Sequence, residues 1–421
     1  MLTYFLFFFY LFCGTILLHL IIRRKIFPFT IYHTTAIVFF KIMMGCLYGW
    51  VFLRNYGGDD TWNYFLESKD QTGLLLRHPV RFFQEFSPSF SLQNTDHHLL
   101  TALIYYINHF ERWFMIKGLA VLNLFSAKNY YIDVLWFEFL TIPGQLLLFK
   151  ILSREFPLRV GMNFLLIFFV PSIVFWCSGI RAEGLLLLFI SLVLYNGDKY
   201  TRKPGGMALF GMLAGFTGIL LIRYQFLVMF LPAFVAFMIS KAKQEKSPVF
   251  FYRIFGGIIL IFGISLFFPP PYQFSRPIQT AQEKFFQLKG NTRYGLDSLS
   301  PGPVPFLKIL PQAIANSSLR PFPWEGKNLL QSLSSVEVIF LFAGLIYFFL
   351  GPRPKRQISH PVYWFFLFYG LSQLILIGFV VPFPGAIVRY RSIALLLLLL
   401  FLYAGNPLLQ RKLRYWIFKL H

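Results

Sequence analysis

The 421-residue sequence has little charge. Asp, Glu, Lys and Arg together make up 13% of the residues, whereas hydrophobic residues make up 57% and phenylalanine alone occurs 55 times. A soluble globular domain has roughly a quarter of its residues charged and close to half of them apolar. The shortage of charge therefore excludes an ordinary soluble domain.

Cysteine is also scarce. The three cysteines, Cys13, Cys46 and Cys177, lie in or at the edge of apolar stretches, and none belongs to a Cys-x-x-Cys pair. Disulfide frameworks and zinc knuckles depend on sets of cysteines at characteristic spacings. The sequence indicates neither, and we expect the three thiols to be packing residues.

Acidic residues are much scarcer than basic ones. There are 17 acidic residues against 39 Lys and Arg, which gives a formal net charge of +22. Nucleic-acid-binding proteins carry such a surplus on one basic face or in a recognised motif. Here it occurs in six short clusters between apolar stretches, so we expect no nucleic-acid partner. The clusters are Arg23-Arg24-Lys25, Lys150/Arg154/Arg159, Lys199/Arg202/Lys203, Lys241/Lys243/Lys246/Arg253, Arg353/Lys355/Arg356 and Arg411/Lys412/Arg414/Lys419.

The basic clusters predict a membrane topology. Cytoplasmic loops of membrane proteins are enriched in Lys and Arg, so the clusters mark the cytoplasmic face. The apolar stretches between them are mostly long enough to cross about 30 Å of hydrocarbon. They predict an all-α polytopic membrane protein with about eleven transmembrane helices, the N-terminus outside and the C-terminus cytoplasmic. The expected spans are 2–22, 33–53, 131–150, 160–177, 184–196, 207–222, 225–240, 250–268, 335–350, 361–381 and 391–405.

Residues 1–421 are predicted to form one transmembrane domain. The apolar N-terminus has no positive n-region and no small-residue cleavage site, which favours an uncleaved first span over a signal peptide. We expect a multi-pass protein of the inner (plasma) membrane of a bacterium, with the lipid bilayer as its partner.

Two of the expected external loops are long, residues 54–130 and 269–334. The first contains two amphipathic stretches, Leu74–Phe86 and His97–Phe114, which we expect to lie flat on the outer surface. The second is rich in Pro and Gly and is expected to be partly irregular. Polar residues that could carry chemistry gather in these loops and in three short external turns.

The first long loop opens with an acidic pair, Asp59-Asp60, followed by Trp62 and Tyr64. Adjacent carboxylates repel each other, which suits the pair to accept a proton or to hold a metal. The two aromatic rings offer faces on which a sugar could stack. Asp59 and Asp60 are therefore candidate catalytic residues, with Trp62 and Tyr64 as sugar-stacking residues. The alternative is a polar turn that caps the next helix, with aromatics in the interfacial belt.

Arginines on the expected outer face form the second candidate site. Lys and Arg of membrane proteins are concentrated on the cytoplasmic side, so positive charge on the outer face needs another explanation. The guanidinium is a rigid fork of donors that suits a phosphate, so we expect this set to bind a lipid-linked phosphate or pyrophosphate. The alternative is that each arginine pairs with a local carboxylate. The candidate phosphate-binding residues are Arg181, Glu183, Arg223, Arg320, Arg389 and Arg391.

Two ionisable residues, Lys41 and Glu138, fall inside expected spans. Charge within a membrane is costly unless it is paired. We predict a structural ion pair between the second and third spans, with a proton relay as the alternative.

Metal ligands are few. Asp96-His97-His98 is a short run of such residues on the first external loop, but adjacent histidines on a helix point about 100° apart and rarely share an ion. A polar helix start is the alternative, because Asp96 near a helix N-terminus is favoured by the dipole. No cofactor is certain, and a divalent metal stays open, with Asp96 and His97 as its ligands.

This layout resembles the GT-C superfamily of membrane glycosyltransferases, polytopic enzymes that take a sugar from a polyprenyl-phosphate carrier on the outer face. Their first large external loop begins with an acidic residue or pair and carries surface-lying helices, as the loop that begins at Asp59-Asp60 does here. The resemblance implies that Asp59 or Asp60 deprotonates an acceptor hydroxyl and that the outer arginines hold the carrier phosphate.

The chain departs from the superfamily in two respects. The acidic pair follows the second expected span, whereas the superfamily usually has it after the first, and we expect no soluble C-terminal domain after the spans. The segments Arg-Pro-Phe-Pro-Trp-Glu, from Arg320, and Val-Arg-Tyr-Arg, from Val388, resemble segments of bacterial envelope-polysaccharide membrane proteins. They associate the chain with surface-glycan assembly.

The leading hypothesis is a glycosyltransferase that moves a sugar from a polyprenyl-phosphate carrier to a cell-envelope glycan or lipid acceptor. A close alternative is a polymerase or ligase of the O-antigen type that uses a pyrophosphate-linked oligosaccharide, in which Arg223 or Arg389 would matter more than Asp59. A lipid or glycan transporter comes third. It would need polar groups along a path through the membrane and discontinuous helices.

Overall fold

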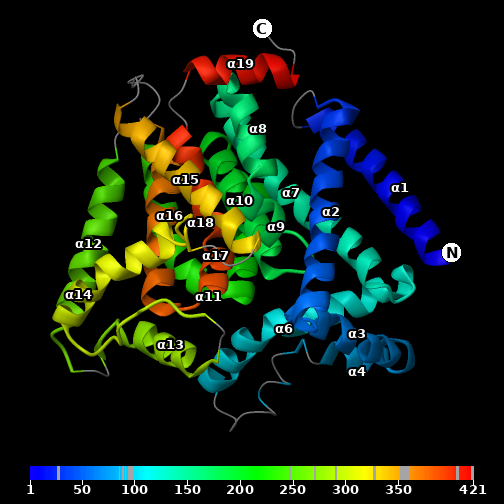
Figure 1. Cartoon of the computed structure of the whole chain (residues 1–421), viewed down its shortest axis with the longest axis horizontal. Coiled ribbons are helices and arrows are strands. Elements are labelled where there is room, and N and C mark those ends of the chain that lie inside the picture. Colours follow the sequence, from blue (N-terminus) through cyan, green and yellow to red (C-terminus); the bar gives the residue numbers. More distant parts are fainter. Residues whose placement is uncertain are drawn as a thin grey trace. The chain divides into compact units, whose positions relative to one another are not determined.

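The computed structural model is built of helices, and the residues that it describes contain no strand (Figure 1). The all-α prediction is confirmed over that part of the chain. The structure describes residues 1–25, 29–84, 86–87, 90, 92, 99–245, 248–269, 272–289, 292–325, 329–350, 360–403 and 407–418.

The chain separates into two compact units, and each has its own apolar core. The first consists of Met1–Glu155, Val174–Tyr200 and Pro204–Leu227, and the second of Phe156–Ile173, Thr201–Lys203 and Val228–His421. Each unit is assembled from stretches that are distant in the sequence. The prediction of a single membrane domain stays a prediction.

The first unit holds the acidic pair and its surroundings. In it α2 packs against α1 and α7, and α3 packs along α6. Phe65, Met115, Val134 and Leu185 belong to one core that joins α3, α6, α7 and α10. Its helices are α1 (Leu2–Lys25), α2 (Ile31–Tyr56), α3 (Asp60–Arg77), α4 (Pro79–Gln84), α6 (Leu99–Ser126), α7 (Tyr130–Glu155) and α10 (Ala182–Arg202), with parts of α9 (Pro171–Trp176) and α11 (Gly206–Ala242).

The second unit is arranged around α16 (Pro361–Val380), which packs against α12, α13, α14, α17, α18 and η3. Helix α16 packs closely against α14 and η3. Gly378 lies at this contact, where an added Cβ would clash with the backbone of Ala313. The other elements are η1 (Pro157–Arg159), α8 (Val160–Phe169), α12 (Val249–Ser265), α13 (Arg276–Gln287), α14 (Pro303–Ile314), η3 (Ala315–Leu319), α15 (Leu329–Leu350), α17 (Pro384–Tyr390), α18 (Ser392–Leu402) and α19 (Pro407–Phe418).

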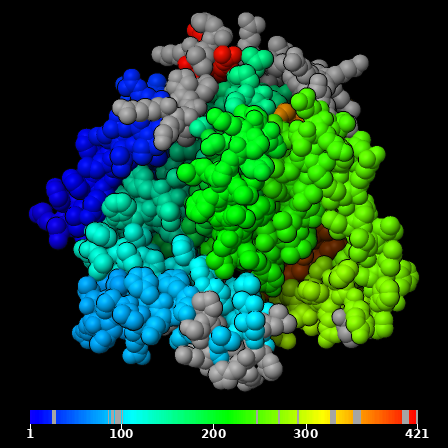
Figure 2. Space-filling model, turned by 180° about the vertical axis from the view of Figure 1, so that it is seen from behind, coloured from blue at the N-terminus to red at the C-terminus, as the bar shows by residue number. Residues whose placement is uncertain are grey.

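Among the described residues, six helices are long and apolar enough to cross a membrane, and a seventh span results if the pair α17 and α18, bent by 55°, is counted as one. The chain is therefore a polytopic membrane protein. The first of these helices, α1, leaves most of its side chains exposed, as its dark-blue atoms in Figure 2 show, which suits contact with lipid. The count of eleven spans and the orientation stay predictions.

One expected span is broken, and two further helix breaks fall where the sequence predicts short external turns. Residues 160–177 form α8 and α9 with an interruption at Val170, whose ψ is 124°. Pro171 explains this break, because proline pushes the residue before it out of the helical region. In α11 the break is at Arg223, with φ −154° and ψ 80°, and between α17 and α18 it is at Arg391. Two of the predicted phosphate-binding arginines thus occupy helix breaks.

The two amphipathic stretches of the first long loop are helical, but with other limits than predicted. The helix α3 begins at Asp60 and ends at Arg77, and Pro79 starts the short α4. The helix α6 continues to Ser126, well beyond the predicted end at Phe114. In Figure 2 the light-blue and cyan residues of α3, α4 and α6 form one continuous mass.

Candidate functional site

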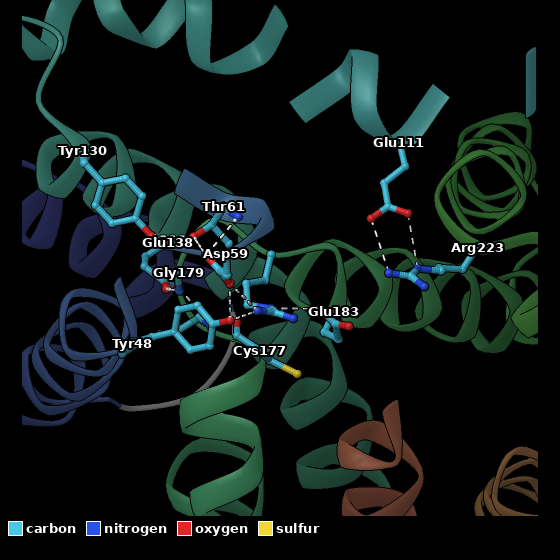
Figure 3. Close-up of polar contacts among 12 residues, drawn as sticks. Tyr48, Asp59, Thr61, Glu111, Tyr130, Glu138, Cys177, Gly179, Glu183 and Arg223 are labelled. Carbon is cyan, nitrogen blue, oxygen red and sulfur yellow. Dashed lines mark hydrogen bonds and ion pairs between the residues drawn. The ribbon is translucent and has the colours of Figure 1, made fainter. Parts of the chain in front are cut away.

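A buried ion pair fixes one turn of the first unit against α2. Lys41 Nζ lies 3.0 Å from Glu138 Oε2 of α7, and the two side chains are 5% and 0% exposed. Lys41 Nζ also donates to the Cys177 carbonyl oxygen at 2.6 Å, and Glu138 accepts from the Gly179 amide (Figure 3). The predicted ion pair between the second and third spans is confirmed. It also holds the turn 177–181 against both helices.

Two glycines let this turn approach α2. A Cβ at Gly45 would lie 2.8 Å from both Glu138 Oε1 and the Gly179 nitrogen. Gly179 has a φ of 76°, in the left-handed region that side chains disfavour. The sequence predicts a short external turn here, but Ser178 and Ile180 are fully buried. The difference arises because Lys41 and Glu138, within α2 and α7, bind the backbone of the turn.

Arg181 leaves this turn and precedes α10. Its guanidinium donates to the Tyr48 hydroxyl, which donates to Asp59 Oδ2 at 2.5 Å. Arg181 Nη1 lies 3.3 Å from Asp59 Oδ2, and Nε lies 3.3 Å from Glu183 Oε2. The structure thus brings a predicted catalytic carboxylate and a predicted phosphate-binding arginine together (Figure 3). It also shows the local carboxylate pairing that was the alternative for Arg181.

Asp59 is the N-cap of α3. Its Oδ1 accepts from the Thr61 amide at 3.1 Å and from the Thr61 hydroxyl at 2.7 Å. Together with Tyr48 and Arg181 on Oδ2, these donors occupy the roughly four acceptor positions of a carboxylate. The alternative interpretation, a polar turn that caps the next helix, is confirmed for Asp59. A role for Asp59 in proton transfer stays a prediction.

Asp60 has different surroundings. It is the first residue of α3 and is exposed, and the helix dipole favours a negative charge there. A general base has to come within hydrogen-bond reach of the hydroxyl that it deprotonates. Of the two adjacent carboxylates, Asp60 is the one that a substrate can approach.

The aromatic residues of this segment pack against the protein. The Trp62 ring stacks on Tyr130 with centroids 3.9 Å apart, and its Nε1 donates to the Gly49 carbonyl oxygen at 2.9 Å. Tyr64 packs against the same core. Because Tyr130 covers one face of Trp62, sugar stacking stays a prediction for the opposite face.

Arg223 lies at the break of α11 and pairs with α6. Its Nε is 3.3 Å from Glu111 Oε2, and the two side chains are 23% and 21% exposed. The preceding residue, Ile222, belongs to the same core as Ile180 and Ala182, the neighbours of Arg181. Arg223 and Arg181 are therefore flanked by one packed cluster. Figure 3 shows Arg223 and Glu111 in one view with Asp59 and Glu183, the partners of Arg181.

In the second unit, Arg391 is buried. It donates to the Ser317 carbonyl oxygen at 3.0 Å, to the Arg320 carbonyl oxygen and to Ser334 Oγ at 2.9 Å. The sequence places Arg391 in a short external turn, but the residue is only 1% exposed. These contacts tie the break before α18 to the segment around η3, which favours a structural role for Arg391.

Arg320 and Arg389 are more accessible. Arg320 Nη2 lies 3.0 Å from Glu325 Oε1, and its guanidinium lies 4.5 Å from the Tyr294 ring centroid. Burial, and then the charge of Glu325, raise the pKa of Tyr294 to about 12, so this phenol is a neutral donor at physiological pH. Arg389 lies over the ring of its neighbour Tyr390, 5.5 Å from the centroid.

The metal prediction rests on residues outside the described part of the chain, because Asp96, His97 and His98 belong to the stretch 93–98. Among the described residues, no group of three or more His, Cys, Asp and Glu side chains is placed to hold a metal ion. A divalent metal therefore stays open as a cofactor.

Sequence reasoning did not identify Tyr48 and Glu111 as part of these clusters. Tyr48 had a usable signal. It follows Lys41 and Gly45 at intervals of seven and three residues, so the three share one face of α2. A lysine, a glycine and a tyrosine on one face of an apolar helix indicate polar packing there. Glu111 is one of several charges on α6 and carries no comparable signal.

The first unit thus brings a buried arginine, two carboxylates and a phenol together beside the exposed Asp60. Comparisons with protein-family models, with curated proteins and with solved structures find no match for this chain.

Proposed function

We propose that this protein is a membrane glycosyltransferase that moves a sugar from a polyprenyl-phosphate carrier to a cell-envelope glycan or lipid acceptor. The observation that carries the proposal is the contact between Arg181 and Asp59, next to the exposed Asp60, where α2 ends. Acidic and guanidinium groups that are distant in the sequence share one site there. Carboxylates far from the arginines would argue against this proposal.

Asp60 is the general base of the proposed reaction. It accepts the proton of the acceptor hydroxyl, whose oxygen forms the new bond to the anomeric carbon while the carrier phosphate leaves. Asp59 is a positioning residue. It caps α3 and holds Arg181, and these contacts fix the backbone that presents Asp60.

Arg223 is the best-placed phosphate ligand of the first unit. Arg181 is 2% exposed and has two carboxylates beside it, so the local charge there is negative and disfavours a phosphate. Arg223 is partly exposed and faces one carboxylate, Glu111. It also stands where the helix resumes after its break, and helix N-termini favour anions. The guanidinium then stabilises the charge on the departing phosphate.

The test is transfer by the full chain reconstituted in vesicles, with polyprenyl-monophosphate sugars as donors. We expect Asp60→Asn to lower the transfer rate by about 10²-fold or more, as the loss of a general base does, and Arg223→Gln to weaken donor binding. Asp297→Asn, an exposed aspartate of the second unit, is the matched control. Full activity of Asp60→Asn would refute the assignment of the base.

A polymerase or ligase of the O-antigen type is the second candidate. One observation favours it: the oxygens of Asp59 already accept four hydrogen bonds, so this carboxylate is poorly suited to take a proton. In that case the arginines carry the reaction. Pyrophosphate-linked oligosaccharide would be the active donor, and Arg223→Gln would abolish transfer while Asp60→Asn would not.

The interrupted helices also fit the third hypothesis, a transporter, because discontinuous spans often line a substrate path. Vesicles distinguish the two classes. Movement of an intact fluorescent polyprenyl-linked sugar between leaflets, without any change in its chemical bonds, would favour transport over transfer.

A further inference from the structure

A cavity of about 320 Å³ lies where α3 packs on α6, within the first unit. Its volume falls at the lower end of the range of small-molecule sites. The charged and aromatic side chains that line it, Glu67, Asp70, Arg112, Lys117, Tyr105 and Trp113, are not those of the Asp59 and Arg181 cluster.

The two walls of the cavity are fixed to each other by buried polar contacts. Asn123 of α6 donates to Ser68 Oγ of α3 at 2.8 Å, and Thr72 Oγ1 donates to the Ala120 carbonyl oxygen at 3.1 Å. Small side chains at Ser68 and Thr72 let the helices pack closely there. A cavity with such walls is formed before a ligand arrives, which lowers the entropy lost on binding.

The polar lining is balanced in charge. Arg112 pairs with Glu67 at 2.5 Å, and the buried Lys117 donates to Gln71 Oε1 at 2.6 Å. Asp70 on α3 completes a set of two carboxylates and two cations. A lining with no net charge selects neither an anion nor a cation. Its mixture of donors and acceptors suits a ligand with several hydroxyl groups, each of which both donates and accepts.

The remaining lining is aromatic. The Trp113 ring lies 6.1 Å from both the Tyr105 and the Phe90 rings, and Trp113 is partly exposed. Aromatic side chains offer large apolar faces at a small cost in conformational entropy. A ligand that matches the cavity therefore has one apolar face and a rim of hydroxyls. From this combination we infer that the cavity binds a neutral saccharide ring.

This site goes beyond the proposed transfer reaction. Binding of a free saccharide here needs neither Asp60 nor Arg223, so the inference stands or fails independently of the proposed function. A polymer or lipid-linked glycan held in this cavity would be kept on the surface formed by α3 and α6.

The test is saturation-transfer NMR on the full chain in lipid nanodiscs, with glucose, galactose and N-acetylglucosamine as neutral probes and glucuronate and inorganic phosphate as anionic ones. We expect saturable binding of at least one neutral sugar. Trp113→Ala should weaken it by about tenfold, in line with the loss of one aromatic stacking face. Trp113→Phe should retain most of it, and Trp416→Ala, 74% exposed on α19, is the control.

A second variant covers the case in which Trp113→Ala does not fold. Asp70 is exposed, so Asp70→Asn should leave folding intact and weaken neutral-sugar binding about tenfold through the lost charged acceptor. Glu283→Gln, an exposed acid of α13, is its control. The inference is refuted if no neutral sugar saturates, if glucuronate or phosphate binds more tightly, or if Asp70→Asn binds as the unaltered chain does.

Discussion

Arg181 and Arg391 are both buried, and both stand directly before a helix, yet their partners differ. Arg181 contacts two carboxylates and a phenol, whereas Arg391 donates to two carbonyl oxygens and a hydroxyl. An arginine among carboxylates shares its charge with groups that can change protonation. An arginine bound to carbonyl oxygens ties backbone segments together. The same residue type at the same kind of position thus serves two purposes.

The largest loss of stability is expected at the ion pair of Lys41 and Glu138, which anchors the turn 177–181. Lys41→Met leaves Glu138 buried without its cation, and breaking a buried pair costs about 3–5 kcal/mol of the free energy of unfolding. Replacing both residues, Lys41→Met with Glu138→Leu, should recover part of this loss. Thermal unfolding in detergent measures it, and an unchanged melting temperature for Lys41→Met would refute the anchoring role.

The next largest loss of stability is expected when Arg181 or Arg391 is replaced. The coupling of each arginine to a carboxylate distinguishes the two sites. Arg181→Met removes the guanidinium beside the buried Glu183, so adding Glu183→Gln should restore part of the stability, with a coupling free energy of up to about 3 kcal/mol. Arg391→Met leaves neutral carbonyl oxygens unsatisfied. Neutralising Glu337, the buried carboxylate of α15 whose charge acts on Arg391, should restore much less. Two double-mutant cycles measure both couplings. Equal couplings would remove the distinction between the two sites.

A smaller effect is expected for Gly45→Ala. The new methyl would lie 2.8 Å from the Gly179 nitrogen and Glu138 Oε1, and overpacking of this kind costs about 1–3 kcal/mol. Alanine regains up to about 1 kcal/mol over glycine within a helix. Gly118→Ala, with open space around the added carbon, is the control and should be neutral or stabilising. Gly45→Ala should therefore melt at a lower temperature than Gly118→Ala.

The smallest effect is expected at Arg320. Its pair with Glu325 has side chains 30% and 23% exposed, and partly solvated pairs contribute at most about 1 kcal/mol. Arg320→Gln should therefore leave thermal stability almost unchanged, in contrast to Arg391→Met. A large destabilisation would show that Arg320, like Arg391, is a structural tie.

Much of the fold follows from the sequence because apolar length decides where a chain can be helical in a membrane. Helices occupy each expected span, and Lys41 and Glu138 pair as charges within a membrane must. The position of the turn 177–181 does not follow, because it depends on which backbone oxygens meet Lys41. Local sequence explains the break at Val170, where proline comes next. The break at Arg223 falls at the short turn that the sequence predicts between the spans 207–222 and 225–240.

The candidate site was predictable only in part. The acidic pair and Arg181 stand out as charged residues beside apolar spans, and the cap on α3 follows from an aspartate two residues before a threonine. The burial of Arg181 and Arg391 does not follow from sequence. It depends on packing between segments that are distant in the chain, and a positive charge at the end of a span gives no sign of its depth.

The contact between Lys41 and the turn at Cys177 has a consequence for the order of events during synthesis. The carbonyl oxygen that Lys41 binds is made 136 residues later, and Glu138 also emerges after α2. A lone lysine at the centre of an inserting helix costs about 2.5–3.5 kcal/mol. The second helix carries this cost until α7 brings the counter-charge of Glu138. The ion pair, and the turn bound to it, can therefore form only after residue 177 has been made.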